Sequence, residues 1–288
     1  MKTEGRRWAE AARYRAGSTL ASMTESLAGL EKISKDDALA EIRSGVEQLA
    51  KLQEAIYAER RVGILIVLQG LDTAGKDGTI RAIFQGVNPQ GVEVSSFKVP
   101  TPEESAHDFL FRIHQRTPER GMVGIFNRSH YEDLIVPLAT GGIDEQELGR
   151  RIQQVAAFEN YLIDQQIQVV KLYLNVSWKV QGERLLRRLD RPDKHWKFSA
   201  GDLATRQKWH DFHSAYQRVV SATSFDGAPW YVIPADKRWY RDLIALHVVL
   251  AAISQLEPKV PAVPIEHIDR YRATLERELG TEEDRRNG

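Results

Sequence analysis

Apolar residues follow two different spacings along the chain, and these spacings predict its secondary structure. Between residues 20 and 60 they recur every three or four positions, as Leu20, Met23 and Leu27 do, which predicts one or two amphipathic helices. After residue 60, short apolar runs alternate with longer helical patterns. The predicted strands are 64–68, 92–99, 122–126, 169–176 and 230–234, and the predicted helices are 77–87, 103–117, 145–166, 178–190, 203–222 and 237–256. Such alternation predicts an α/β fold, with helices on both faces of a parallel sheet.

The first predicted strand leads into a glycine-rich turn with the spacing of a P-loop. Gly70, Gly75 and Lys76 match the pattern Gly-x-x-x-x-Gly-Lys. Backbone N–H groups in such a loop, together with a helix N-terminus, bind phosphate oxygens, and the lysine adds a point charge. The residues expected to bind phosphate here are Gly70, Ala74, Gly75, Lys76, Asp77, Gly78 and Thr79.

Two carboxylates set this loop apart from most P-loops. Asp77 stands where a Ser or Thr hydroxyl usually holds Mg²⁺. Asp72 lies inside the loop, where it would repel a phosphate by roughly 4 kcal/mol at about 4 Å and an effective dielectric of about 20. We therefore expect Asp72 to bind Mg²⁺ or to meet an arginine. The alternative is an aspartate that only stabilises the turn.

A second polar cluster follows the third predicted strand. Asn127 and Arg128 stand at the carboxyl end of that strand, which faces the ligand crevice in an open α/β sheet. Glu132 and Asp133 follow within about one helical turn. We expect them to complete a metal site, because P-loop kinases place a carboxylate near the end of a neighbouring strand. Alternatively, both acids only add negative charge to the first turn of a helix.

Asp108 and Arg112, upstream of this cluster, are four residues apart. The spacing allows an ion pair on a helix surface. Alternatively, Arg112 holds an acceptor phosphate.

A strongly basic segment covers residues 179–197, with seven Lys or Arg, three acids and a net charge of +4. The basic residues are Lys179, Arg184, Arg187, Arg188, Arg191, Lys194 and Lys197. Most of the arginines can share one helical face, and Pro192 ends the helix so that 194–197 form a loop. A cationic helix and loop over a phosphate crevice is what a kinase lid requires. We prefer this interpretation to a solvated charged face.

Composition narrows the class of protein. The chain has 288 residues, with 40 Lys and Arg, 40 Asp and Glu, and no cysteine. The charge balance leaves no overall field to recruit nucleic acid or a membrane, and the lack of cysteine excludes disulfides, thiolate chemistry and Cys-ligated zinc. Segment 1–17 is charged, and no apolar stretch approaches transmembrane length. We expect a cytoplasmic protein without a nucleic-acid or membrane partner.

Together these motifs resemble the polyphosphate kinase 2 family. The likeness covers about residues 35–257 and rests on segments 70–78, 86–91, 96–98, 127–133 and 194–198. It implies a three-layer α/β/α P-loop kinase fold akin to thymidylate kinase, with five parallel strands. It also implies Mg²⁺-dependent, reversible phosphoryl transfer between inorganic polyphosphate and a nucleotide, with AMP or ADP as the acceptor and ATP among the products.

The resemblance also implies roles for individual residues. The expected catalytic residues are Asp72, Lys76, Arg128, Glu132 and Asp133, of which Asp72, Glu132 and Asp133 are the expected metal ligands. The expected lid contacts to phosphate are Arg184, Arg187, Arg188, Lys194 and Lys197, and the expected acceptor-binding residues are Asp108, Arg112, Asn127 and Arg128. Many members carry Asp-Arg-Ser-Trp-Tyr-Asn-Arg where this chain has Asn-Arg-Ser-His-Tyr-Glu-Asp. Because of this departure, the carboxylate role is expected at Glu132 or Asp133 and not at Asn127. The variant motif resembles that of the branch of the family that phosphorylates nucleoside monophosphates as well as diphosphates.

Three segments are expected in the chain. They are an N-terminal helical extension at 1–34, a P-loop phosphotransferase domain at 35–257 with a lid at about 179–202, and a C-terminal helix and tail at 258–288. We also expect a homo-oligomer, a dimer or a tetramer. Two other functions remain open: an ATP-dependent kinase of a nucleotide or small metabolite, and a non-catalytic nucleotide-binding regulator.

Overall fold

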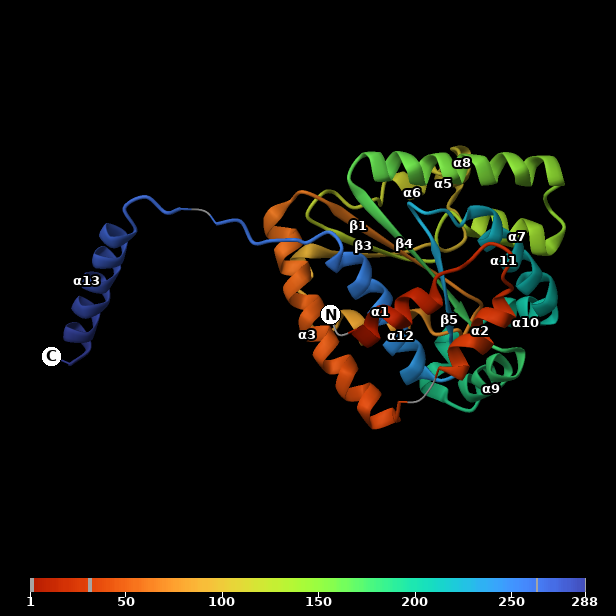
Figure 1. Cartoon of the computed structure of the whole chain (residues 1–288), viewed down its shortest axis with the longest axis horizontal. Coiled ribbons are helices and arrows are strands. Elements are labelled where there is room, and N and C mark those ends of the chain that lie inside the picture. Colours follow the sequence, from red (N-terminus) through yellow and green to blue (C-terminus); the bar gives the residue numbers. More distant parts are fainter. Residues whose placement is uncertain (1–2, 31–32, 263, 288) are drawn as a thin grey trace.

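A parallel five-stranded sheet forms the centre of the computed structural model, which describes residues 3–30, 33–262 and 264–287 (Figure 1). The strands stand in the order β2-β3-β1-β4-β5. Their bounds are β1 Gly63–Gln69, β2 Val92–Ser96, β3 Val123–Asn127, β4 Ile167–Asn175 and β5 Trp230–Pro234. β1 is buried along its whole length, and its register pairs Ile66 with Ile125 of β3 and Val170 of β4. The continuous apolar run of β1 suits a strand that is covered on both faces.

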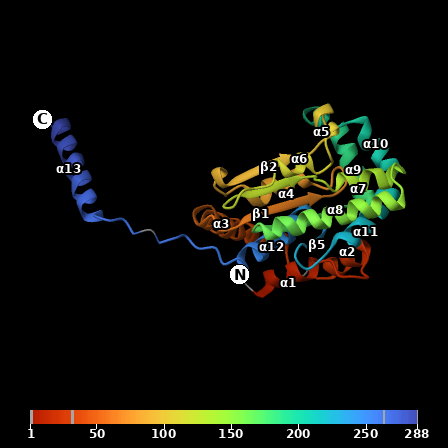
Figure 2. The same ribbon diagram turned by 90° about the horizontal axis from the view of Figure 1, so that it is seen from above.

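Two layers of helices cover the sheet, as Figure 2 shows from above. One layer contains α3 (Lys35–Glu59), α4 (Lys76–Phe84) and α12 (Arg238–Ser254), which pack on one another, with α1 (Thr3–Ala12) against α12. The other layer contains α7 (Glu132–Thr140), α8 (Glu145–Asp164) and α11 (Trp209–Thr223), while α2 (Leu20–Gly29) packs beside β5. The predicted three-layer α/β/α architecture is therefore confirmed.

The remaining short elements lie on the segments that follow β2 and β4. They are α5 (Pro102–Ala106), α6 (Phe111–His114), α9 (Trp178–Leu189), η2 (Pro192–Lys197) and α10 (Ala200–Gln207), while η1 (Pro89–Gly91) directly precedes β2. Because parallel strands end at the same edge of a sheet, the segments after β1, β3, β4 and β5 meet there. The P-loop, the cluster at 127–133 and the basic segment at 179–197 are thus brought to one edge.

Three predicted elements differ in the structure. The helix predicted at 103–117 is divided into α5 and α6, because Asp108 accepts a hydrogen bond from the backbone N–H of Leu110 (3.0 Å) and starts a new turn. The helix predicted at 203–222 is likewise divided at Lys208 into α10 and α11. β2 ends at Ser96 instead of residue 99, because its partner strand β3 ends at Asn127, which pairs with Ser96.

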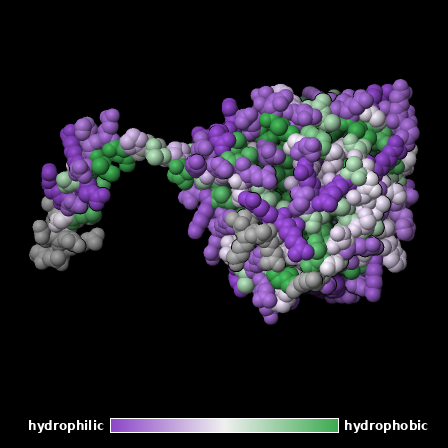
Figure 3. Space-filling view, in the orientation of Figure 1, coloured by the Kyte–Doolittle hydropathy of each residue, from purple (hydrophilic) through white to green (hydrophobic). Residues whose placement is uncertain are grey.

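The C-terminal helix α13 (Ile268–Asn287) lies apart from the sheet and its layers (Figures 1 and 2). Exposed apolar side chains recur along it at Ile268, Tyr271, Leu275 and Leu279, and Figure 3 shows hydrophobic residues among hydrophilic ones in this arm. Within the described part of the chain, no helix combines the length and the apolar character needed to cross a membrane.

Candidate active site

The loop between β1 and α4 has the conformation that its glycines allow. Gly70 and Gly75 have φ angles of 150° and 107°, in the region that favours glycine. A Cβ on Gly75 would stand 1.8 Å from Nη1 of Arg241, so a larger residue would displace that arginine. α4 begins directly afterwards at Lys76. The predicted strand, loop and helix N-terminus are therefore present, and this arrangement suits an anion.

Lys76 is buried against the loop. Its exposed fraction is 8%, and its Nζ donates hydrogen bonds to the carbonyl oxygens of Gly70 (2.6 Å) and Leu71 (3.4 Å). Burial and the positive charge of Arg128 lower the pKa of Lys76. Carbonyl oxygens are weaker partners for an ammonium than a phosphate oxygen. The side chain is therefore placed to exchange them for a bound phosphate.

Arg128 joins a carboxylate of the P-loop to a carboxylate of α7. Its Nη2 lies 2.6 Å from Oδ1 of Asp72, and its Nη1 lies 3.1 Å from Oε2 of Glu132. Burial by itself lowers the pKa of an arginine, but Glu132 and Asp72 outweigh it and raise the pKa of Arg128. The prediction that Asp72 meets an arginine is confirmed, and its contact with Mg²⁺ stays a prediction.

The backbone at Arg128 is strained. Its φ of 65° is left-handed, which costs a residue other than glycine on the order of 1–3 kcal/mol. The Arg128 N–H donates to the carbonyl of Leu68 (3.0 Å), and the Tyr131 N–H donates to Oγ of Ser129 (3.2 Å). These bonds hold a tight turn between β3 and α7, and the turn brings the guanidinium to the P-loop.

Glu132 and Asp133 both lie in the first turn of α7, but their carboxylates have different partners. Glu132 is paired with Arg128, whereas Oδ2 of Asp133 lies 3.5 Å from Nη2 of Arg112. Burial raises the pKa of Asp133, although Arg112 opposes the shift. Among the residues that the structure describes, no group of three or more His, Cys, Asp or Glu is arranged to hold a metal ion. The predicted trio of Asp72, Glu132 and Asp133 therefore does not form a cage of its own.

Arg112 is buried and already has polar partners on both terminal nitrogens. Its exposed fraction is 6%, its Nη1 donates to the carbonyl of Lys98 (2.8 Å), and its guanidinium lies 5.7 Å from the ring centre of Phe97. Glu104 adds a carboxylate 3.8 Å from Nη1. An acceptor phosphate at Arg112 would compete with Asp133 and Glu104.

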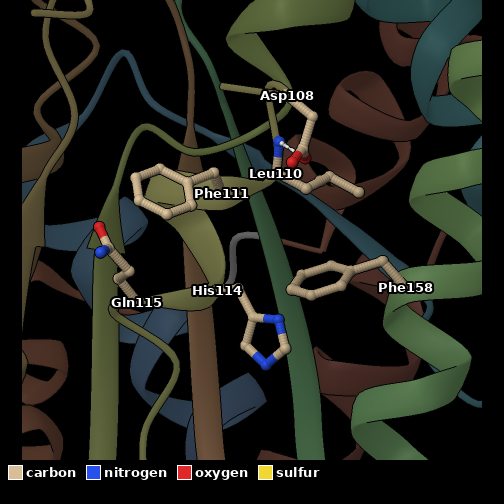
Figure 4. A pocket seen from close by; sticks show the side chains of 6 residues that line it. All are labelled: Asp108, Leu110, Phe111, His114, Gln115 and Phe158. Atoms are coloured by element: carbon tan, nitrogen blue, oxygen red, sulfur yellow. Dashed lines mark hydrogen bonds between the residues drawn. The ribbon is translucent and has the colours of Figure 1, made fainter. Parts of the chain in front are cut away.

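Asp108 does not pair with Arg112, so the predicted i,i+4 ion pair is wrong. The helix is interrupted at this point, and the carboxylate caps Leu110 instead. Asp108 lines an open, mainly apolar pocket of about 510 Å³. Figure 4 shows the side chains that surround it, which are Asp108, Leu110, Phe111, His114, Gln115 and Phe158. The other predicted acceptor residues are not among the described residues that line this pocket; they are Arg112, Asn127 and Arg128.

Asp77 connects the start of α4 with β3 and with the lid. Its Oδ1 accepts a hydrogen bond from Nδ2 of Asn127 (2.8 Å), and its Oδ2 accepts one from Nζ of Lys197 (3.2 Å). Partial burial raises the pKa of Asp77, but the hydrogen bonds from Asn127 and Lys197 outweigh it and lower the pKa below its usual 3.8. The basic segment, which we call the lid after its predicted role, therefore reaches the P-loop helix.

Arg184 of α9 braces the P-loop from the lid side. Its exposed fraction is 8%, and its two terminal nitrogens donate to the carbonyls of Thr73 (2.9 Å), Ala74 (3.3 Å), Ala235 (2.7 Å) and Asp236 (2.8 Å). Burial, together with neighbouring arginines, lowers the pKa of Arg184 to about 10. In this conformation its donors serve the loop backbone, and its predicted contact with phosphate stays a prediction.

The other lid cations have fewer contacts with the body of the protein. Arg188 donates to the carbonyl of Lys197 (3.1 Å) and to Asp202 (3.3 Å). Arg187 is exposed, and its Nε donates to the carbonyl of Glu183 in the same helix (3.4 Å), while Lys194 pairs with the neighbouring Asp193 (3.1 Å). Arg184 therefore braces the loop, whereas the contacts of Arg187, Arg188 and Lys194 lie within segment 179–202.

Two buried residues of α12 belong to the site but were not predicted. Arg241 donates to the carbonyl of Ala74 (3.2 Å), pairs with Asp242 (2.7 Å), and limits the space at Gly75 and Gly78. The hydroxyl of Thr79 donates to Asp242 (3.2 Å), so this predicted phosphate ligand points to α12 here. A charged Arg-Asp pair inside an otherwise apolar helix was the signal available in the sequence.

Comparisons with known proteins agree with this geometry. A family model described as polyphosphate kinase 2 matches residues 32–261. An AMP/ADP-polyphosphate phosphotransferase from Meiothermus ruber is 45% identical over 214 residues, which are 74% of this chain and 80% of the relative. An ADP-polyphosphate phosphotransferase from Rhodopseudomonas palustris is 38% identical over 232 residues, 76% of this chain and 80% of the relative.

Solved structures extend the similarity to the fold. The crystal structure of polyphosphate kinase 2 from Arthrobacter aurescens TC1 matches with a TM-score of 0.88 and 39% identity, and covers 93% of this chain and 96% of that one. A putative polyphosphate kinase 2 from Pseudomonas aeruginosa matches with a TM-score of 0.74 and 28% identity, over 78% of this chain and 49% of that one.

Proposed function

The chain belongs to the polyphosphate kinase 2 family, and from this premise we propose that it transfers a phosphoryl group from inorganic polyphosphate to AMP, ADP or both. The observation that carries the proposal is the meeting of Lys76 and Arg128 at one P-loop. Lys76 is buried and Arg128 is half-buried. The negative charge of Asp72 acts on both cations, and the positive charge of Arg128 acts on Lys76. Fixed positive charge at this place is what a transferring phosphoryl group needs.

Each part of the site has a task in this reaction. The loop amides and the N-terminus of α4 bind the oxygens of the transferring phosphate. Lys76 leaves the carbonyls of Gly70 and Leu71 and binds a phosphate oxygen, while Arg128 neutralises charge that spreads over the equatorial oxygens. The acceptor is itself a phosphate anion and a competent nucleophile. No protein side chain has to remove a proton from it.

The carboxylates fit a Mg²⁺ ion that is shared with the substrate. Mg²⁺ is usually held by one or two carboxylates together with substrate phosphates and water, and not by an all-protein cage. Asp72 and Glu132 both contact Arg128 and so flank one point next to the loop, whereas the carboxylate of Asp133 is directed to Arg112 of α6. We therefore propose Asp72 and Glu132 as the ligands. The ion would offset the charge of the donor and acceptor phosphates as they approach.

The donor and the acceptor approach from different sides in this proposal. The exposed Arg187, with the half-buried Lys194 and Lys197, would form the surface along which the polymer lies. Asn127, Arg128 and Arg112 lie on the side of β3 and α6, where the acceptor phosphate would bind. Asp108 is left out of this set because it lines the other pocket.

A test of donors and acceptors decides between this function and its rivals. AMP and ADP are supplied separately with polyphosphate and Mg²⁺ but without ATP, and ADP and ATP are followed by chromatography. We expect ADP from AMP and ATP from ADP, with little product when EDTA replaces Mg²⁺. Product only when ATP is the donor would support the metabolite kinase, and nucleotide binding without any transfer would support the regulator.

We also propose that the protein is cytoplasmic and works as a homo-oligomer. Light scattering tests the second point, because a monomer mass that does not change with concentration would contradict it. Fractionation of the source cells tests the first, and recovery of the protein with the envelope would contradict it.

A further inference from the structure

A fully buried ion pair lies behind the turn that carries Arg128. Lys171 of β4 and Glu159 of α8 both have 0% exposure, and Nζ of Lys171 lies 2.6 Å from Oε2 of Glu159. Lys171 also donates to the hydroxyl of Tyr131 (3.1 Å) and to the carbonyl of Thr223 (2.7 Å). All three ammonium protons are therefore used. Burial lowers the pKa of Lys171, and the ion pair with Lys171 keeps the pKa of Glu159 low despite its own burial.

This pair is not explained by stability alone. Replacing a buried ion pair by apolar residues of similar volume is often neutral or stabilising, and the surrounding wall is already aromatic. The rings of Tyr131, Phe225 and Trp230 lie 5.6, 5.0 and 5.4 Å from Nζ of Lys171. An apolar pair would pack well in this environment. We therefore infer that the two charged residues have a role besides stability.

The ion pair holds two of the three residues that separate Arg128 from Glu132 on the way into α7, His130 and Tyr131. The Tyr131 hydroxyl donates to Oε1 of Glu159 (2.8 Å), and Nε2 of His130 lies 3.4 Å from the same oxygen. Both side chains are fully buried. We call Lys171, Glu159, Tyr131 and His130 the buried anchor.

The anchor faces the strained backbone that positions the guanidinium. On one side the Arg128 N–H is tied to Leu68 of β1, and on the other side Tyr131 is tied to Glu159 and Lys171. A left-handed residue persists only where its surroundings hold it in place, and the turn at Arg128 is held from both directions.

We propose that the buried anchor is the positioning device for Arg128 in phosphoryl transfer, with Lys171, Glu159 and Tyr131 as positioning residues. This inference rests on the proposed function of the site. It predicts that loosening the anchor moves the guanidinium without removing it. Transfer then slows because a small misplacement at a reacting centre is costly, while binding of the polymer elsewhere is unaffected.

The main test compares two tyrosine variants. Tyr131→Phe removes one hydroxyl of the anchor and leaves the ring in place. Tyr14→Phe is the matched control, because Tyr14 is also buried and its hydroxyl also donates one hydrogen bond and accepts another, to Ser18 and from Gln217. We expect kcat for ATP formation to fall about tenfold in Tyr131→Phe, with the KM for polyphosphate within about twofold, and wild-type kcat in Tyr14→Phe. Equal kcat in the two variants overturns the proposal.

A double-mutant cycle separates positioning from general loosening. Tyr131→Phe is made in wild-type protein and in an Arg128→Ala background, and kcat is measured in all four proteins. If the anchor acts through Arg128, the tyrosine change has less than about a twofold effect once Arg128 is gone. The same factor in both backgrounds contradicts the proposal.

Changes at the ion pair need a variant that still folds. Lys171→Ala alone leaves a buried carboxylate without its partner, whereas Lys171→Met with Glu159→Leu removes both charges. We expect this double variant to stay folded at the assay temperature, with a somewhat lower melting temperature because the buried Tyr131 hydroxyl loses both of these partners, and to show the low kcat of Tyr131→Phe; wild-type kcat in it overturns the proposal. Wild-type protein that makes no product from polyphosphate would instead contradict the proposed function, whatever the variants do.

Discussion

The P-loop and the lid both depend on basic side chains, but they are held in opposite ways. Three cations bind carbonyl oxygens of the P-loop from inside the protein: Lys76, Arg184 and Arg241. The end of the lid is joined to the rest by exposed or half-exposed pairs such as Lys197 with Asp77. The loop is therefore preorganised, whereas the lid is fastened by contacts that salt and water weaken. This difference suggests that the loop determines kcat and the lid determines capture of the polymer.

The largest effect is expected at the P-loop lysine. Lys76→Ala should lower kcat for polyphosphate-dependent ATP formation by at least about 10³-fold, because the charge that stabilises the transferring phosphate is lost. The control is Lys259→Ala, at an exposed position beyond α12, which should leave kcat unchanged. Near-normal turnover by Lys76→Ala would contradict the claim that the P-loop determines kcat.

Two arginines of the same helix give the next test. Arg184→Met removes a buried brace of four carbonyls and should lower the free energy of unfolding by about 2–4 kcal/mol. Arg187→Met, at an exposed position on α9, should change it by less than about 0.5 kcal/mol. Urea denaturation measures both. Equal losses in the two variants would mean that the inner and outer lid cations do not differ.

A smaller effect is expected at the tip of the lid. Lys197→Ala should raise the KM for polyphosphate about fivefold with kcat within about twofold, since an exposed charge contact contributes about 1 kcal/mol or less. Added salt should reduce the difference between variant and wild type. A variant that loses kcat and keeps its KM would place Lys197 among the residues of the chemical step.

The smallest effect concerns pH. Asp77 has a lowered pKa in the folded protein, so its pairing with Lys197 and Asn127 adds stability above the unfolded value of about 3.8 and loses it as pH falls through the lower, folded value. The stability difference between wild type and Asp77→Asn, from urea denaturation, should be constant between about pH 5 and pH 7, should shrink as the pH falls below about 4, and should vanish only below the lowered pKa of folded Asp77. A stability difference between wild type and Asp77→Asn that grows as the pH falls would contradict this prediction.

The fold and the loop could be predicted because their signals are local in the sequence. The apolar run before Gly70 and the spacing to Lys76 define a strand, a turn and a helix start without any knowledge of distant residues. The alternation of strand and helix patterns then determines the three layers. Asp72 could be interpreted from its charge alone, because a carboxylate in a phosphate loop requires a cation as neighbour.

The missed features depend on residues far apart in the sequence. The pairing of Arg241 with Ala74 joins segments 167 positions apart, and that of Arg184 with Thr73 joins segments 111 apart. Helical spacing placed Arg184 on one cationic face with the other lid arginines, but α9 packs so that Arg184 contacts the loop backbone while Arg187 is exposed. Asp108 was expected on a continuous helix, and the break before Leu110 changed its partner.

One measurement tests the division between loop and lid most directly. The rate of ATP formation from ADP is recorded against polyphosphate concentration for wild type, Lys76→Ala and Lys197→Ala. We predict an active wild type, a collapse of kcat in Lys76→Ala, and a raised KM with nearly unchanged kcat in Lys197→Ala. No ATP from the wild type, or a collapse of kcat in Lys197→Ala beside near-normal turnover in Lys76→Ala, would contradict the account.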